Sequence, residues 1–520
     1  MISTSVFTRL LTQGYFPREL PPTFSTTSFG NAAATSWNTL YGLFRSVKQH
    51  ALVTHHSLPR SGFLRRDLGI VNPVMFGQLA FEIANEWPNI NHRIQRSVWS
   101  KSTPVLDTRN FRAFTPSSGP ADLVVPKSRM RVAKKVLLKT DISRFYNSIY
   151  THSVPWAFHG KSIAKQNRSP GLAGNRIDRA LRKCADGQTI GIAIGPDTSL
   201  IVAELILSDI DAALQATQSN LLGLRYIDDY EIVAETRGMA EDIISSLQEL
   251  LSDFELEPNA TKTKILDLPI ALEDAWVDDL RSLPLRLNSK AQHTDLVRLF
   301  DRAIEYARRN SGSLVMRFFI GRLRQSNIDK ANWDLCQLLL AQCILQESGT
   351  IQHALSLVLE YKQRAYIPGR DILEPTLNFA IREQCRLGHT NEVSWAVWGL
   401  MTLNYQLDTL TISALENVGD PVVTLLVLHA ERLGICQRSL NPVLWSSMMT
   451  ATELYGEWWL LAYEAAVRGW LTPVAGHNYV KADPAFASLA AMNVRFYDDK
   501  AIGILPAVVA LKAGLSATSY

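Results

Sequence analysis

Residues 223–235 read GLRYIDDYEIVAE, with two adjacent aspartates, Asp228 and Asp229, in the middle. The residues on both sides, such as Tyr226 and Ile232, are aromatic or β-branched, which favours two short strands joined at the aspartates. A tight hairpin turn explains one carboxylate, but its usual partner is glycine, as in Asn-Gly or Asp-Gly. Two interpretations therefore stay open: a polar turn, or two carboxylates held at a strand tip to bind metal ions.

A second stretch places another aspartate at the end of a strand. In KKVLLKTDISRFY (residues 134–146), the apolar run from Val136 to Leu138 predicts a buried strand that leads into Asp141. A desolvated carboxylate is costly without a partner. If this strand lies beside the hairpin, three carboxylates converge, and hard oxygen ligands of that number suit two Mg²⁺ ions. Such a pair of ions would clamp the attacking and leaving oxygens of a phosphoryl transfer.

Two further elements complete the chemical pattern. The glycine-rich stretch IGIAIGPDTS (residues 190–199) contains Gly195 and Pro196, and Asp197, Thr198 or Ser199 is expected to cap the apolar helix that follows. Glycine would let a base pair or template strand approach the backbone closely here. Further along, Lys262 lies at a turn and could meet triphosphate charge.

The composition is that of a globular protein with substantial cores. Of 520 residues, 47% are hydrophobic and 20% charged, and the net charge of +4 demands no polyanionic partner for the chain as a whole. The five cysteines show no C-x-x-C spacing, which indicates reduced, mostly buried thiols. The start of the chain lacks a secretory pattern, and no apolar run reaches the roughly 18–20 residues of a membrane helix. We expect a cytoplasmic protein without a membrane partner.

The pattern of apolar and polar residues changes near residue 290. Up to that point, proline and glycine interrupt short strand-like runs and the helices between them, which is typical of an α+β fold. Beyond it, amphipathic segments such as DLVRLFDRAIEYARR (residues 295–309) follow one another with apolar residues at helical spacing. We therefore predict an α+β domain over residues 1–289 and an all-α, repeat-like domain of stacked helices over residues 290–520.

The order of these elements resembles a polymerase palm, and specifically that of the reverse transcriptases. Four stretches look like motifs A to D of that family, in the family's order: TDISRFY (residues 140–146), IGPDTS (194–199), YIDD (226–229) and NATKT (259–263). The resemblance implies a right-hand fingers–palm fold and RNA-directed DNA polymerase activity, in which a 3′-hydroxyl attacks the α-phosphate of a dNTP and pyrophosphate leaves.

The resemblance also implies roles for individual residues. Asp141, Asp228 and Asp229 would hold Mg²⁺, or Mn²⁺ in its place, with the main-chain carbonyl of Ile142 as a further ligand. Tyr146 stands at the sugar gate, where a bulky aromatic ring clashes with a 2′-hydroxyl and so favours deoxynucleotides. The nucleotide-binding set implied in this way is Ile142, Tyr146, Gly195, Pro196, Lys262 and Arg66.

A narrower resemblance is to the bacterial abortive-infection and defence-associated (unknown-group) reverse transcriptases. Four stretches carry it: GYFPRELPPTFST (residues 14–26), RDLGIVNP (66–73), HSVPWAFHGK (152–161) and GPDTSLIVAELILSDID (195–211). Members of that group join fingers and palm to an α-helical repeat domain. The resemblance implies a bacterial cytoplasmic enzyme of anti-phage defence. Its partners would be dNTPs and a nucleic-acid template or product, with a non-coding RNA or a second copy of the chain as further partners.

Three positions depart from the family pattern. Val71 and Ala193 replace prolines, and Ile194 stands where many templated enzymes carry glutamine, which removes a polar contact to nucleotide or template. An alternative is therefore untemplated or protein-primed synthesis, giving DNA attached to the protein; Tyr497 and Tyr520 are candidate primers among the C-terminal tyrosines.

Two other functions are disfavoured by the site residues. Tyr146 and Tyr-Ile-Asp-Asp argue against an RNA-dependent RNA polymerase, and the three carboxylates argue against a non-catalytic RNA-binding scaffold.

A basic segment lies before the strand that leads into Asp141. In VVPKSRMRVAKK (residues 124–135), Lys127, Arg129 and Arg131 alternate as on one side of a strand. This strand could follow a nucleic-acid backbone or simply be a solvated face.

Overall fold

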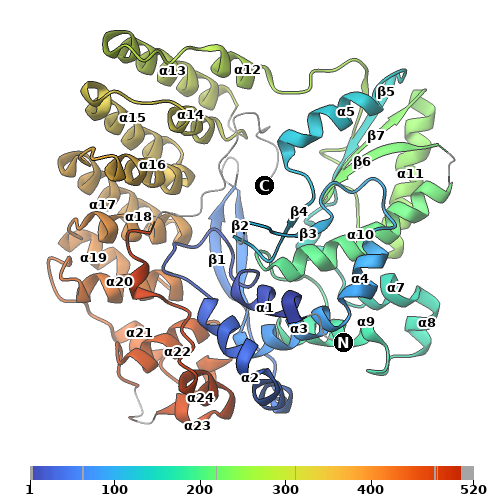
Figure 1. Ribbon diagram of the computed structural model, residues 1–520, viewed down its shortest axis with the longest axis horizontal. Coiled ribbons are helices and arrows are strands. Elements are labelled where there is room, and N and C mark those ends of the chain that lie inside the picture. The colour runs from blue at the N-terminus through green and yellow to red at the C-terminus, as the bar shows by residue number, and fades with distance from the viewer. Residues whose placement is uncertain are drawn as a thin grey trace.

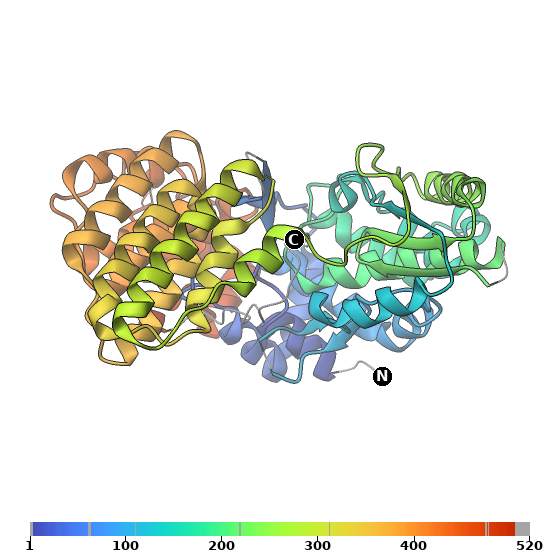
Figure 2. The ribbon, with the colours of Figure 1, turned by 90° about the horizontal axis from the view of Figure 1, so that it is seen from above.

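The protein is a mixed helix and strand chain with a strand-containing half and a helical half side by side (Figure 2). The computed structural model describes residues 4–60, 64–109, 111–217, 220–310, 312–473, 476 and 478–504. In Figure 1 a two-stranded hairpin lies between the helical stack on the left and the larger sheet on the right.

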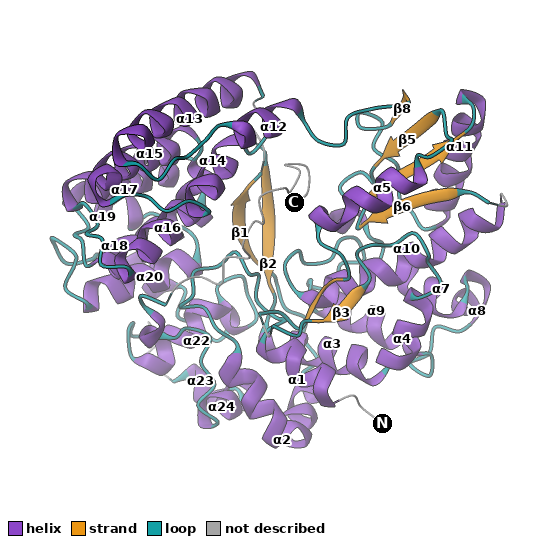
Figure 3. Cartoon of the chain, turned by 45° about the horizontal axis from the view of Figure 1, so that its top comes forward, coloured by secondary structure: helices purple, strands orange, loops and turns teal. Residues whose placement is uncertain are grey.

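The larger sheet has four antiparallel strands in the order β6–β7–β5–β8 (Figure 3). Strand β5 pairs with β7 up to the contact between Thr140 and Tyr230. The residue before Asp141 therefore lies opposite the residue after Asp229, so the two stretches are neighbouring strands, as expected. The strand bounds are β5 (Val136–Thr140), β6 (Leu222–Tyr226), β7 (Asp229–Ala234) and β8 (Lys264–Asp267).

Alternation along the strands gives the sheet two apolar faces. Leu138 and Ile232 face the main core, where the helices α10 (Asp197–Thr217) and α11 (Arg237–Asp253) pack. Leu137, Leu224 and Val233 face a smaller cluster with Leu123 and Met130, which lie seven residues apart.

The basic segment is not the strand that its alternating charges predict. It forms the helix α5 (Val124–Met130), with Pro126 in its first turn, where proline is tolerated. Leu123 and Met130 bury one side of this helix against the sheet, so apolar contacts at helical spacing outweigh the period-two pattern of charges.

The small sheet is a hairpin that joins the two halves. Strand β1 (Thr54–Pro59) pairs with β2 (Arg65–Ile70) over their full length. The Arg65 guanidinium binds both carboxylate oxygens of Glu392 at 2.5 and 2.7 Å, and Trp459 donates from Nε1 to the Ile70 carbonyl at 3.1 Å. The hairpin is therefore fastened to the helical half at both ends of β2.

The other elements of the strand-containing half surround these two sheets. They are α1 (Thr4–Thr12), α2 (Thr27–Ser46), α3 (Pro73–Asn85), α4 (Trp87–Ile94), β3 (Pro104–Leu106), β4 (Phe114–Pro116), α6 (Phe145–Ser148), α7 (Ser153–His159), α8 (Lys161–Gln166) and α9 (Ala173–Lys183).

Beyond Asp267 the described residues form helices and no strand. Neighbours pack in succession, α15 on α17, α17 on α18 and α18 on α20, as in a stack of helix pairs. The helices are α12 (Ala275–Ser282), α13 (Ser289–Arg309), α14 (Val315–Arg324), α15 (Trp333–Gln346), α16 (Ile351–Gln363), α17 (Arg370–Arg386), α18 (Thr390–Leu403), α19 (Thr409–Leu415), α20 (Pro421–Arg432), α21 (Val443–Ser447), α22 (Trp459–Arg468), α23 (Tyr479–Ala482) and α24 (Pro484–Ala491).

Segments from the two ends of the sequence lie side by side. Phe24 and Tyr497 form an antiparallel bridge, and the Asp498 amide donates to the Thr23 carbonyl at 2.6 Å. Ser28 Oγ donates to the Arg495 carbonyl at 2.7 Å. The last described residues of the helical half thus complete the packing of the N-terminal segment.

The cysteines and the lengths of the helices bear on two expectations from the sequence. Cys184, Cys336 and Cys343 are buried free thiols, as predicted, whereas Cys385 and Cys436 are half-buried. None of the helices in the described ranges is both long and apolar enough to cross a membrane.

Candidate active site

The tip of the β6–β7 hairpin is a two-residue turn with an unusual backbone. Ile227 has φ of +54°, a left-handed conformation that β-branched residues rarely adopt. Asp228 is half-buried, and Asp229 begins β7 at the surface. An ordinary polar turn would place glycine or asparagine where Ile227 stands, so this tip holds a conformation that the surrounding structure must enforce.

Asp141 ends β5 as a buried carboxylate with one free oxygen. Its main-chain carbonyl accepts from the Asn259 amide at 2.7 Å, and its Oδ2 forms an ion pair with the Lys262 ammonium. Its Oδ1 is buried without a hydrogen-bond partner among the described residues. Because an unpaired buried acceptor is costly, an orphan oxygen of this kind indicates a ligand that the chain itself does not supply.

The three carboxylates act on one another electrostatically. Although Asp229 keeps exposed surface, the protein around its carboxyl group and the charges of Asp228 and Asp141 raise its pKa to about 7. Burial and the charge of Asp141 also raise the pKa of Asp228. Lys262 and Arg66 act in the opposite direction. A cation bound among these groups would relieve the repulsion that raises both pKa values.

The residues present fit Mg²⁺ by their chemistry, although they form no closed cage. In the described ranges, no group of three or more His, Cys, Asp or Glu side chains is arranged to hold a metal ion. Mg²⁺ is commonly held by one or two carboxylates together with substrate phosphates, and the free Oδ1 of Asp141 offers it an oxygen ligand. Ile142 follows Asp141 and bridges to Pro258, and its role as a ligand stays a prediction.

The turn that carries Lys262 is built by Asn259. The Asn259 carbonyl accepts from the Lys262 amide at 3.1 Å, and its side chain accepts from the Thr261 amide at 3.2 Å. The Lys262 side chain is about half exposed and reaches Asp141. It is therefore at the site, as predicted, where its charge faces both the carboxylates and solvent.

Arg66 comes to the same site from the β1–β2 hairpin. It is half-buried. Burial and the neighbouring Arg60 lower the pKa of Arg66, while the Asp228 carboxylate opposes that shift. The structure thus brings Arg66 within electrostatic reach of Asp228.

Tyr146 lies beside the glycine-rich stretch. It is half-buried in the short helix α6, with its ring 5.3 Å from that of Phe145. Its carbonyl accepts from the Ile192 amide at 2.9 Å. The predicted gate residue is therefore tied to the stretch that leads into Gly195.

The space beside two glycines of that stretch is occupied by other parts of the chain. Gly195 has φ of +125°, and a Cβ there would lie 2.5 Å from Pro17 Cγ. A Cβ on Gly191 would lie 3.2 Å from the Asn147 carbonyl oxygen. Protein atoms therefore fill the space that a side chain at either position would need, and the close approach of a base pair or template to this backbone stays a prediction.

Asp197, one of the three residues expected to cap α10, is instead the first residue of that helix and fixes the turn from another direction. Its carboxylate accepts from the Ala113 and Phe114 amides at 2.9 and 3.0 Å and forms an ion pair with Arg112. Arg112 also donates to the Gly195 carbonyl at 2.9 Å. Sequence reasoning missed Arg112, because a single arginine in a loop carries no pattern.

Two of the three basic side chains of residues 124–135, and a further arginine on α9, have acidic partners. Lys127 and Arg131 of the α5 region pair with Glu231 at 2.9 and 3.0 Å. Arg176 of α9 pairs with Glu82 and Glu86 at 2.9 and 2.7 Å. These contacts leave less free positive charge than the sequence indicates.

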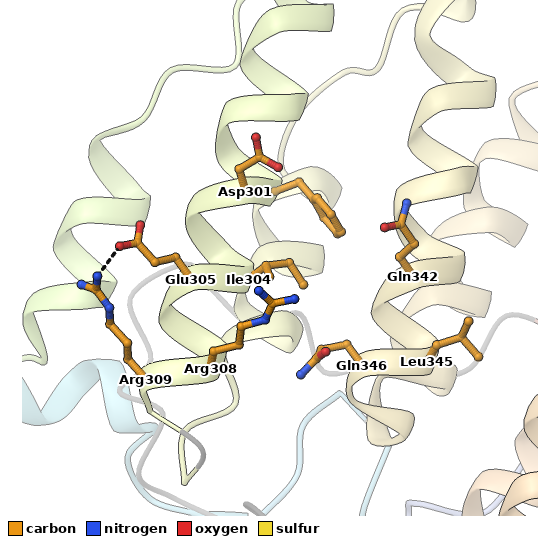
Figure 4. A pocket seen from close by; sticks show the side chains of 9 residues that line it. Asp301, Ile304, Glu305, Arg308, Arg309, Gln342, Leu345 and Gln346 are labelled. Carbon is orange, nitrogen blue, oxygen red and sulfur yellow. Dashed lines mark ion pairs between the residues drawn. The ribbon is translucent and has the colours of Figure 1, made fainter.

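A groove of about 720 Å³ lies elsewhere, between α13 and α15 (Figure 4). It contains none of the predicted site residues, and Glu305 at its edge pairs with Arg309 at 2.7 Å. Its lining residues are Phe300, Asp301, Ile304, Glu305, Arg308, Arg309, Gln342, Leu345 and Gln346.

Comparisons with known proteins give only a coarse likeness. No family model and no curated protein matches the chain. Apo telomerase from Candida tropicalis is similar at 12% identity and a TM-score of 0.33, over 79% of this chain and 74% of that one. Telomerase from Candida albicans, in complex with a TWJ fragment of telomeric RNA, is similar at 10% identity and a TM-score of 0.27, over 72% and 69%. At these scores the likeness carries no argument, so function must be judged from the site.

Proposed function

We propose that the chain is a reverse-transcriptase-like DNA polymerase of right-hand fold that adds dNTPs to a 3′-hydroxyl with the help of two Mg²⁺ ions. The observation that carries this proposal is the buried Asp141, with its unpartnered oxygen, beside the strained tip that bears Asp228 and Asp229. The cationic side chains of Lys262 and Arg66, which act on the same carboxylates, further support it.

Each residue has a task in this proposal. Asp141, Asp228 and Asp229 hold the metals, whose chemistry is to neutralise triphosphate charge and to activate the attacking hydroxyl. Lys262 and Arg66 bind triphosphate oxygens, and Tyr146 excludes the 2′-hydroxyl. Catalysis then rests on positioning and charge neutralisation more than on covalent chemistry.

A test of the polymerase activity compares carboxylates on the same sheet. Purified protein is given labelled dNTPs or NTPs with Mg²⁺ and a primed template or none, and incorporation is measured. Asp228→Asn with Asp229→Asn should abolish incorporation, whereas Asp267→Asn, at the exposed end of β8, should leave it intact. No incorporation by the wild type, or equal loss in both variants, contradicts the proposal.

Protein priming remains the alternative form of this activity. Tyr497 does not suit the role, because it is fully buried and its hydroxyl lies 2.9 Å from His429 Nδ1. Tyr520 lies outside the described residues. A nuclease-sensitive mobility shift of the protein that survives denaturing electrophoresis would establish covalent priming, and free DNA product would exclude it.

The proposed setting is anti-phage defence in the bacterial cytoplasm, supported by the resemblance in residues 10–290. The proposed partners are a nucleic-acid template or product, a non-coding RNA and a second copy of the chain. Sequencing the nucleic acid that co-purifies with the protein would identify template and product together. If the Asp228→Asn, Asp229→Asn protein protects cells from phage as well as the wild type does, the polymerase is not the defensive activity.

A further inference from the structure

A buried charge network lies directly beneath the acidic tip. The Arg225 guanidinium donates to Glu204 Oε1 and Oε2 at 2.9 and 3.0 Å and to Asp211 Oδ2 at 2.8 Å. None of these three side chains has any exposed surface. Arg225 is in β6, two residues before the turn, whereas the two carboxylates lie seven residues apart on one face of α10.

Hydroxyl groups complete the network around the two carboxylates. Asp211 accepts from Ser97 Oγ at 2.6 Å and from the Tyr230 hydroxyl at 2.9 Å. Glu204 accepts from Ser100 Oγ at 2.8 Å and from Ser102 Oγ at 2.6 Å. Every carboxylate oxygen of the network therefore has a partner, as a buried ionic cluster requires.

The network also holds the main chain of the strained residue. Arg225 Nη1 donates to the Ile227 carbonyl at 2.8 Å, and the Ile227 amide donates to Ser102 Oγ at 2.7 Å. Both polar groups of the Ile227 backbone are thus fixed by side chains. Ile227 is the residue whose φ of +54° sets the direction of the chain into Asp228.

The energetics favour a positional role over a purely stabilising one. Burying charges is costly, and a well-packed apolar cluster of the same volume would stabilise a core at least as well. A β-branched residue in the left-handed conformation adds a further cost and persists only where its surroundings enforce it. The chain carries both costs at the one turn where the candidate metal ligands lie.

We propose that Arg225 and Ser102 are positioning residues, which hold Ile227 in its left-handed conformation and thereby direct the Asp228 and Asp229 carboxylates toward the metal ions. Glu204 and Asp211 fix the guanidinium of Arg225. This inference rests on the proposed function, because it concerns how the same site is built.

The chain offers a matched pair of serines for the test. Ser102→Ala and Ser100→Ala each remove one hydroxyl that donates to Glu204, but only Ser102 also contacts Ile227. Mn²⁺ is titrated calorimetrically into both variants and the wild type, Mg²⁺ dependence of dNTP incorporation is recorded, and thermal unfolding is measured in parallel.

The expected result separates the two serines in metal binding. Ser102→Ala should weaken Mn²⁺ binding roughly 10-fold and raise the Mg²⁺ concentration for half-maximal incorporation by a similar factor, as supporting contacts around metal ligands do. Ser100→Ala should leave both values within about twofold of the wild type. If Ser102→Ala does not fold, Ser102→Cys keeps the side-chain size with a much weaker hydrogen-bonding group and should weaken binding several-fold.

Two outcomes distinguish the possible failures. Equal Mn²⁺ affinity in Ser102→Ala and Ser100→Ala, with a wild type that binds Mn²⁺ through Asp228 and Asp229, overturns the positioning role alone. A wild type whose Mn²⁺ affinity is unchanged by Asp228→Asn with Asp229→Asn overturns the proposed function itself.

Discussion

His56 Nδ1, on the β1–β2 hairpin, lies 2.8 Å from Asp420 Oδ2, at the start of α20. Both side chains are almost completely buried. Asp420 also accepts from the Val422 and Val423 amides at 2.8 and 3.0 Å, so a single carboxylate caps a helix and binds the hairpin that carries Arg66. The geometry of one site residue therefore depends on the helical half.

The first prediction concerns this pair. Asp420→Ala removes both a helix cap and the hydrogen-bond partner of the buried His56, so it should lower the free energy of unfolding by roughly 3 kcal/mol. Asp483→Ala is the control: Asp483 caps α24 through the Ala485 and Phe486 amides and accepts from the Tyr455 hydroxyl at 3.0 Å but binds no histidine, so its loss should cost about 1–2 kcal/mol. Denaturant titration measures both, and equal losses would contradict a special role for His56.

The second prediction concerns pH. Glu347 lies 3.3 Å from Arg317, yet burial outweighs this attraction and raises the pKa of Glu347 to about 7. The folded state therefore binds this proton more tightly than the unfolded state, in which the pKa is about 4.3. This contribution to stability is fully present below pH of about 4.3 and is lost as the pH rises towards 7.

Glu347→Gln removes that dependence. The unfolding free energy of the variant minus that of the wild type should increase between pH 5 and 7 and then level off above pH 8. Urea denaturation of both proteins across this range gives the difference. A difference that instead decreases with pH would show that the ion pair, and not burial, dominates.

The third prediction concerns sugar choice. Tyr146→Ala should lower the preference for dNTPs over NTPs, measured as the ratio of kcat/KM values, by at least roughly 10-fold. Tyr150→Ala is the control, because Tyr150 belongs to the same segment but packs against Trp156. If the ratio of kcat/KM values for dNTPs and NTPs is unchanged in Tyr146→Ala, Tyr146 does not select the sugar.

The fourth prediction separates packing from nucleotide contact at Gly195. Gly195→Ala forces an unfavourable φ and a clash with Pro17, so it should destabilise the fold by at least about 2 kcal/mol. Gly238→Ala, in α11 with open space around it, should be neutral or slightly stabilising. A stable Gly195→Ala protein that loses only nucleotide affinity would contradict the packing role.

Local patterns predicted the centre of the site well. The apolar run before Asp141 and the β-branched residues around Asp228 indicated the two strands, because those preferences depend on near neighbours. The alternating charges of Lys127, Arg129 and Arg131 predicted a strand wrongly, because apolar contacts between α5 and the sheet favour a helix there. Local reasoning could not detect that Pro17 fills the space at Gly195, since that contact joins distant segments.

Sequence reasoning missed the charge network for a similar reason, although its charged residues lie in two of the motif-bearing stretches. Glu204 and Asp211 are acidic interruptions of an apolar helix, and Arg225 lies in the quoted hairpin. The sequence does not show that these three residues meet, because their contact depends on how α10 packs beneath β6. Charged residues in otherwise apolar segments are the signal that could have been used.

The bridge between the N-terminal segment and the last described residues has a consequence for biosynthesis. Ser28 and Arg495, which hydrogen-bond to each other, are 467 residues apart. At 5–20 residues per second, a ribosome needs roughly 25–90 s to make the second partner after the first. The apolar surfaces of Phe24 and Phe29, which pack against Tyr497 and Phe496, must stay covered by other means during that interval, so the nascent chain should depend on chaperones until those residues have been made.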